Sequence, residues 1–197
     1  MAKELIIDTT SKYLVVALAD DKKVLNKIQY VAWKRQSEYA MKEIENILDK
    51  TNTKIQEIQR IIVSKGPGSY TGIRIALTIA KILGFALQIP VCDLSSLQAM
   101  CGSKGKKIAI LDARSNRAYI GIYDNGKEVL KDRVLTMDEI RKLVSEYSDY
   151  EIVGDRELLG LDSREIDYAE MMFELGKILP DCLDIDALKP IYLKETI

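Results

Sequence analysis

Apolar and polar positions alternate along the first third of the chain in a pattern that predicts a βββαβ unit. Short apolar runs bounded by polar turns predict strands at residues 4–9, Tyr13–Ala19, 23–31 and Arg60–Ser64. Before the last of these strands, apolar side chains recur at helical spacing over residues 38–50, with Ser37 as the expected N-cap. Such a unit is an antiparallel meander that a parallel strand extends after a crossover helix.

The same order of elements returns in the second half of the chain. Strands are predicted at Ile108–Leu111, Ala118–Tyr123, 127–135 and Glu151–Gly154, and a helix capped by Thr136 is predicted at Met137–Tyr147. The two copies align without a gap, and at one constant offset Asp8 falls on Asp112, Ser11 on Ser115, Asp20 on Asp124 and Lys23 on Lys127. This agreement predicts a structural duplication.

The duplication implies an α/β fold with two lobes, each a mixed sheet with flanking helices. The glycine-containing stretch 102–105 marks the expected boundary, so the first lobe covers residues 1–102 and the second covers residues 103–197. Too few residues follow Gly154 to repeat the stretch 65–102. We therefore expect the second lobe to be abbreviated.

A glycine-rich block connects the strand that ends at Ser64 to a long helix. It is not a Walker A loop, because no Gly-Lys-Ser/Thr follows, and its glycine spacing is not that of a dinucleotide site. Its backbone amides could hold an anion at the helix N-terminus. The simpler interpretation is a close-packed strand-to-helix turn, in which a Cβ would block the backbone. The structural residues of this turn would be Gly66, Pro67, Gly68, Ser69, Thr71 and Gly72.

The helix predicted over residues 70–87 is apolar around more of its circumference than one sheet can cover. At about 100° per residue its apolar side chains fill an arc of roughly 220°, whereas a helix lying on a sheet needs little more than ~100°. The remaining polar stripe contains Arg74, Thr78, Lys81 and Gln88, with Phe85 among them.

Part of this helix therefore needs a cover, from the second lobe or from another chain. If Ile75, Ile79 and Ile82 stayed in water, each would forfeit ~1.5–3 kcal/mol of burial. Small residues at four-residue spacing would let a second helix approach closely; they are Ala76, Ala80 and Gly84.

Composition narrows the chemistry that the chain can perform. Its 197 residues are 47% apolar, enough for a continuous core. With 29 Lys and Arg against 30 Asp and Glu, the net charge is -1, so any RNA contact would be local or made through a partner. The chain contains no histidine, which excludes Ser-His-Asp devices and histidine zinc sites. We predict no cofactor, no metal site and no catalytic residue.

The cysteines and the N-terminus point to a cytoplasmic protein. Cys92, Cys101 and Cys182 are odd in number and form no C-x-x-C, which favours reduced core thiols. The N-terminus becomes acidic by Glu4 without an apolar run long enough for a signal peptide. No segment is expected to approach the ~18 apolar residues of a membrane span.

Several segments together resemble the bacterial TsaB (YeaZ) family. The glycine block and its helix, Gly66–Leu77, are specific, and the other pieces occur in the right order. Resemblance is good over residues 1–135 and thin afterwards. It implies the duplicated ribonuclease-H-like fold of the actin, sugar-kinase and heat-shock ATPase superfamily. The other pieces are Ile6-Ile7-Asp8-Thr9-Thr10, Ala80-Lys81, Leu94-Ser95-Ser96-Leu97, Asp112-Ala113-Arg114 and Pro190-Ile191-Tyr192-Leu193.

The resemblance implies a non-catalytic scaffold subunit that supports a TsaD-like subunit in the threonylcarbamoylation of adenosine in tRNA. A TsaE-like ATPase would join the complex, and tRNA would be met indirectly. In that family the helices matching 38–50 and 70–87 form the dimer surface, with TsaD or with a second copy. The expected interface residues are Met41, Ile44, Leu48, Tyr70, Arg74, Ile75, Leu77, Thr78, Ile79, Lys81 and Ile82.

The sequence departs from the family pattern at two places, and two other functions fit some of its residues. Relatives usually read His-Ser-Glu where this chain has Gln36-Ser37-Glu38, and Asp-Ala-Arg continues here with Ser-Asn-Arg. An ATPase or phosphotransferase could use Asp8 and Asp112 around Mg²⁺, although the turn after Asp8 lacks the glycine of the superfamily's phosphate loop. A carboxylate nuclease drawing on Asp8, Glu38 and Asp112 is the other alternative.

Overall fold

The structure, a computed structural model, describes residues 2–193 and contains two mixed β-sheets. The first sheet has the strand order β3-β2-β1-β4-β5 and the second has the order β8-β7-β6-β9. The strands are β1 (Lys3–Asp8), β2 (Tyr13–Asp20), β3 (Val24–Val31), β4 (Ile58–Ser64), β5 (Val91–Leu94), β6 (Lys106–Arg114), β7 (Arg117–Asp124), β8 (Lys127–Thr136) and β9 (Glu151–Gly154). The α-helices are α1 (Gln36–Lys50), α2 (Tyr70–Leu87), α3 (Ser96–Cys101), α4 (Met137–Glu146) and α5 (Tyr168–Gly176), and the 3-10 helices are η1 (Ile55–Glu57), η2 (Arg156–Leu159) and η3 (Ile185–Ala187).

The predicted duplication is confirmed. In the first sheet β1 pairs antiparallel with β2 and parallel with β4, and in the second sheet β6 pairs antiparallel with β7 and parallel with β9. Each helix that precedes the parallel strand, α1 or α4, is a crossover. The turn after the first strand is also shared, because Asp8 accepts a hydrogen bond from Thr10 N and Asp112 accepts one from Arg114 N, each at 2.7 Å.

The helix caps and the short elements differ from the sequence prediction. Thr136 caps α4 as expected, in a capping box with Glu139. Helix α1 instead begins two residues earlier than predicted, with Arg35 at the N-cap and without a side-chain cap bond, so the assignment of Ser37 as the cap was wrong. Strand β5 and helices α3 and α5 were not predicted.

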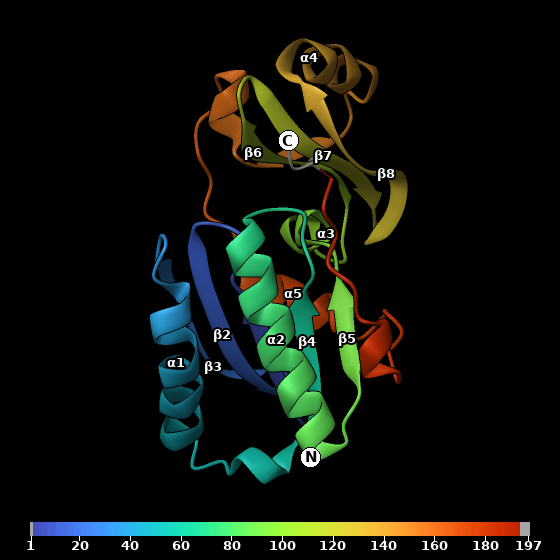
Figure 1. Ribbon diagram of the computed structural model, residues 1–197. Coiled ribbons are helices and arrows are strands. Elements are labelled where there is room, and N and C mark those ends of the chain that lie inside the picture. The colour runs from blue at the N-terminus through green and yellow to red at the C-terminus, as the bar shows by residue number, and fades with distance from the viewer. Residues whose placement is uncertain (1, 194–197) are drawn as a thin grey trace.

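The elements form successive layers, with helices outside and between the sheets (Figure 1). Helices α1 and α2 cover one face of the first sheet, where alternate residues such as Leu5, Ile7 and Val16 enter a common core with them. The opposite face, with Ile6 and Val15, packs with α3, α5 and the inner face of the second sheet. Helix α4 covers the outer face of the second sheet. The first sheet is therefore buried on both faces, as its near-continuous apolar strands require.

Helix α5 lies on the first sheet although it follows the second sheet in the chain. Its Phe173 and Leu175 are 2% and 0% exposed in the core that contains Ile6 and Ile62. Burying each such side chain contributes ~1.5–3 kcal/mol. The second face of the first sheet is thus completed by residues from beyond position 102.

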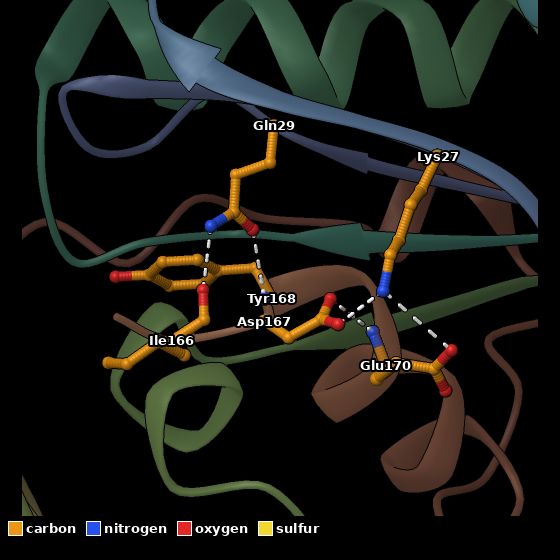
Figure 2. Close-up of polar contacts among 6 residues, drawn as sticks. All are labelled: Lys27, Gln29, Ile166, Asp167, Tyr168 and Glu170. Atoms are coloured by element: carbon orange, nitrogen blue, oxygen red, sulfur yellow. Dashed lines mark hydrogen bonds and ion pairs between the residues drawn. The ribbon is translucent and has the colours of Figure 1, made fainter. Parts of the chain in front are cut away.

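Polar contacts fasten the start of α5 to β3 (Figure 2). The Gln29 amide donates to Ile166 O at 2.6 Å and accepts from Tyr168 N at 3.0 Å. Beside it, Lys27 forms an ion pair with Asp167 and lies 3.9 Å from a carboxylate oxygen of Glu170. Because Gln29 satisfies one backbone acceptor and one backbone donor at a helix start, it fixes the register of α5 against β3.

The sequence predicted three core thiols, and the prediction is confirmed for two of the three cysteines. Cys92 and Cys101 are free and buried, whereas Cys182 is partly exposed. Burial raises the pKa of Cys92 to about 12 and raises the pKa of Cys101 as well. These two thiols therefore stay protonated and unreactive at neutral pH.

Helix α2 corrects the expectation that no segment has the length and composition of a membrane span. Its 18 residues have a mean hydropathy of 1.4, which meets that description. In the folded chain, however, the helix lies along the first sheet, and its Ile73, Ala76 and Ala80 are no more than 1% exposed. The core therefore accounts for the apolar residues on one side of α2. It does not account for those on the opposite side.

Candidate partner interface and the adjoining cleft

Helix α2 is fixed at both ends by local sequence. Ser69 caps its N-terminus by accepting a hydrogen bond from Gly72 N at 3.2 Å. Gln88 ends it in a left-handed conformation with φ 54°. The small side chains that were expected to admit a partner helix face this subunit's own core instead, where a Cβ on Gly84 would lie 2.9 Å from the Ile185 side chain. That expectation was wrong; the small residues are Ala76, Ala80 and Gly84.

The opposite side of α2 carries large apolar side chains in solvent. Tyr70, Ile82 and Phe85 are 54%, 61% and 79% exposed, and Met41 on neighbouring α1 is 46% exposed. The sequence prediction missed Phe85, because it placed this residue in the polar stripe of the helix. The folded chain therefore leaves part of the apolar surface of α2 in solvent, at Tyr70 where the helix begins and at Ile82 and Phe85 near its end.

A groove of about 470 Å³ runs between α1 and α2 below this exposed side. Ile79, which is 9% exposed, contributes to its lining, and Ile75 is partly buried there. Lys81 is partly buried. Six predicted interface residues line the groove, with Ser37 and Thr71: they are Met41, Tyr70, Arg74, Ile75, Thr78 and Ile79.

Three predicted interface residues are core residues. Ile44, Leu48 and Leu77 are 1%, 8% and 5% exposed and pack with the first sheet. They shape the surface from beneath, so a partner has little of them to contact. Sequence periodicity showed that these positions are apolar, but it did not show which apolar positions the sheet would cover.

Aromatic and cationic groups order the N-terminal end of the groove. The rings of Tyr70 and Tyr192 stack with centroids 5.0 Å apart. Arg74 lies over the Tyr70 ring and donates to its hydroxyl at 2.9 Å. Tyr192 was not predicted as a site residue. Its segment was noticed only through the family resemblance, because an irregular segment has no periodic signal.

The glycine block packs closely against the turn between β1 and β2. A Cβ on Gly68 or Gly72 would lie 2.2 or 1.9 Å from a backbone oxygen of Thr10 or Thr9. Ser69 N donates to Thr10 O at 2.7 Å, and Thr9 Oγ1 donates to Gly72 O at 2.6 Å. The block therefore holds the start of α2 against the turn between β1 and β2.

A cleft of about 730 Å³ adjoins the groove and receives residues from both lobes. Thr10 and Gln36 line it from the first lobe, and Asp112 and Tyr119 line it from the second. The cleft shares Ser37, Tyr70, Thr71 and Ile75 with the groove, so the two hollows form one continuous surface.

The two carboxylates considered for a metal differ in their surroundings. Asp8 is 1% exposed, and one of its oxygens accepts from both Thr10 N and Thr10 Oγ1 at 2.7 Å. Burial raises the pKa of Asp8, and these bonds oppose the shift. Asp112 is exposed, and Glu38 pairs with Arg35. Within residues 2–193 no cluster of three acidic or cysteine ligands forms a metal site, so Asp8, Glu38 and Asp112 are not brought together as one.

Comparison with known proteins identifies relatives of the chain. The family model "TsaD: tRNA N6-adenosine threonylcarbamoyltransferase" matches residues 29–149. The tRNA threonylcarbamoyladenosine biosynthesis protein TsaB of Bacillus subtilis is 33% identical over 150 residues, which cover 72% of this chain and 66% of that protein. The TsaB proteins of Escherichia coli and Haemophilus influenzae are 29% and 23% identical, over 60% and 98% of this chain and 54% and 94% of their own lengths. The chain thus spans less than two thirds of the Bacillus and Escherichia proteins.

Solved structures agree on the fold. YeaZ from Pseudomonas aeruginosa superposes with a TM-score of 0.76 at 20% identity, covering 98% of this chain and all of that one. A Pseudomonas protein described as similar to peptidase YEAZ gives 0.78, also at 20% identity and over 98% of this chain and 100% of that one. With the two repeated sheets, this likeness defines the class as two-lobed proteins with a duplicated ribonuclease-H-like fold. Within that class, the chain belongs to the TsaB (YeaZ) family.

Proposed function

We propose that this chain is a non-catalytic scaffold subunit that binds a TsaD-like subunit through the exposed side of α1 and α2. The observation that carries the proposal is the set of exposed apolar side chains on α1 and α2, namely Met41, Tyr70, Ile82 and Phe85, of which Met41 and Tyr70 line the groove. Because relatives in the family are tRNA threonylcarbamoyladenosine biosynthesis proteins, we assign the chain to that pathway. A TsaE-like ATPase would join the complex, which we place in the cytoplasm.

The free energy of burial favours an occupied interface. Covering a side chain such as Ile82 or Phe85 contributes ~1.5–3 kcal/mol. The groove between the same two helices is lined by polar groups as well, including Arg74 and Thr78. An apolar centre with a polar rim is the usual anatomy of a protein interface.

The turn between β1 and β2 supports a non-catalytic role. In a phosphate-binding turn, free backbone amides point at the phosphate. Here Thr10 N is already bonded to Asp8, and the carbonyl of Thr10 accepts from Ser69 N. The Thr10 amide is therefore not free to point at a phosphate, and the Thr10 carbonyl holds the start of α2.

The test is a charge placed on the exposed side of α2. Phe85→Glu should weaken the affinity for the TsaD-like subunit of the same organism about tenfold or more, as the loss of an interface hot-spot side chain does. The change should leave the thermal unfolding midpoint unaltered, because Phe85 is 79% exposed. Affinity can be measured by isothermal titration.

Leu183→Glu is the matched control, since Leu183 is 83% exposed and lies outside α1 and α2. It should bind like the parent chain. If Phe85→Glu also binds like the parent, the proposed surface is wrong. Sedimentation of the chain alone would show whether the same surface forms a homodimer, because Phe85→Glu should then also abolish that dimer.

A further inference from the structure

Four cationic side chains lie at the cleft or next to it: Lys34 and Arg114 line it, and Lys12 and Arg117 flank the lining segments. Lys12 and Lys34 come from the first lobe, where Ala32 N donates to Lys12 O at 3.0 Å and so joins the two loops. Arg114 and Arg117 come from the second lobe, and they are paired directly across β6 and β7. None of the four forms an ion pair with an acidic side chain in the described part of the chain.

One exposed and one partly buried aromatic ring lie next to two of these cations. Trp33, the chain's one tryptophan, is 50% exposed, and the Arg114 guanidinium lies 6.0 Å from its ring centre. The Lys12 ammonium lies 5.4 Å from the ring centre of Tyr13. Aromatic faces interleaved with cations are the recurring surface on which unpaired nucleic-acid bases stack while their phosphates are neutralised.

The acidic groups nearby discriminate between anionic partners. Asp112 lines the cleft just behind Arg114, and Asp155 accepts from Asp112 N at 2.8 Å. Glu38, on the first lobe, is already paired with Arg35. The carboxylates of an acidic peptide that entered the cleft would be repelled by the Asp112 carboxylate. A ribonucleotide strand would instead offer ribose hydroxyls and base amino groups as donors, with its phosphates left at the cationic rim.

We propose that the mouth of the cleft is a contact surface for a single-stranded segment of RNA, with a base on Trp33 and the phosphates beside Arg114, Arg117 and Lys34. The choice of RNA rests on the proposed function in tRNA modification. The net charge of -1 is no obstacle, because the cations are concentrated at one place. The cleft is continuous with the groove of the proposed partner surface, so one RNA could touch both subunits.

The experiment measures binding of an unmodified tRNA transcript to the full chain by fluorescence anisotropy at several salt concentrations. Trp33→Ala should weaken binding about tenfold, because stacking of one base contributes ~1–3 kcal/mol. The double variant R114E/R117E should weaken binding further. R114Q/R117Q, which adds no negative charge, should lower the slope of log affinity against log salt by about 1 to 2.

The control is K127E/K131E, which makes the same charge change as R114E/R117E on exposed residues of β8. It should bind RNA like the parent chain. R114E/R117E should still co-purify with the TsaD-like subunit, which separates this inference from the proposed function. Retained subunit binding with lost RNA binding supports the inference.

Three results would overturn it. One is equal loss of RNA binding in K127E/K131E, which would mean that only net charge matters. Another is competition by polyglutamate or by AMP as effective as competition by a second tRNA, which would indicate an acidic-peptide or mononucleotide site. The third is an undetectable affinity for the transcript while the subunit still binds, which would leave the proposed function standing alone.

Discussion

The two lobes share a topology but differ in what lies on their outer faces. Helix α4 of the second lobe buries Met137 and Ile140 and shows solvent a charged side, as a helix on a single sheet should. Helix α2 of the first lobe exposes Ile82 and Phe85. No α-helix between β9 and residue 193 takes the corresponding place beside α4, because α5 packs on the first sheet. The apolar surface thus lies on the element that the duplication does not repeat. Where one copy of a repeat carries an unmatched, over-apolar element, that element is the place to look for function.

The largest expected effect is the loss of stability when a glycine of the closely packed block, which the second lobe does not repeat, is replaced and compared with a glycine in open space. Gly72→Ala should destabilise the chain by on the order of 3 kcal/mol, because a Cβ would lie 1.9 Å from Thr9 O and the backbone would have to move. Gly160 has a positive φ of 75°, but a Cβ there would meet none of the described atoms within 4 Å, so Gly160→Ala should cost only ~1–2 kcal/mol. Urea unfolding of both variants measures the contrast. Equal losses would mean that close packing is not the reason for Gly72.

The first lobe's buried carboxylate, Asp8, should make the stability of the chain depend on pH. Because burial raises the pKa of Asp8 in the folded state, its protonated form favours folding, and stability is lost as pH rises from the unfolded-state pKa through the folded-state pKa. Asp8→Asn removes that loss, so the variant should gain stability relative to the parent as pH rises. The new amide would lie near the buried Ser64 side chain, whose interaction with the Asp8 carboxylate opposes the rise in the Asp8 pKa.

Denaturant unfolding between about pH 4 and about pH 8 provides the measurement. The parent chain, unfolded in the same buffers, is the reference for the variant. A curve for Asp8→Asn that runs parallel to that of the parent would show that Asp8 does not titrate differently in the folded and unfolded chain.

The smallest expected effects are changes of stability at the N-termini of the crossover helices α1 and α4. Thr136→Ala should cost about 1 kcal/mol, because the Thr136 hydroxyl caps α4 and its partner Glu139 closes the capping box. Ser37→Ala should change stability by less than about 0.5 kcal/mol, since Ser37 is exposed and does not cap α1. Thermal unfolding of the two variants distinguishes them. A larger loss at Ser37 would restore the cap that the sequence suggested.

Periodicity was sufficient to predict the repeated elements. The bounds of α2 and β9 agree with the prediction, because a long helix has clear ends and a strand after a helix has few alternatives. Strand β5 was missed because its run of four residues is too short to show a period. Helix α5 was missed because both lobes cover it, so its apolar residues form no single stripe.

The interface could be predicted only to the level of the helix. Ile79 and Ile82 are equally apolar and three residues apart, yet one is 9% exposed and the other 61%. Their difference depends on where the first sheet and η3 meet α2, which is a property of the fold. Likewise the cations at the cleft mouth are far apart in the sequence, at Lys12, Lys34 and Arg114, and only the pairing of the lobes brings them together.

The position of α5 has a consequence for synthesis on the ribosome. Because the chain emerges from its N-terminus, the inner face of the first sheet, with Ile6, Val15 and Ile62, has no α5 over it until residues 168–176 have been made. The second sheet, made in between, has all its strands before that point. The first half to be translated is therefore the last to be sealed, and a nascent chain halted between the sheets would present a bare apolar surface to chaperones.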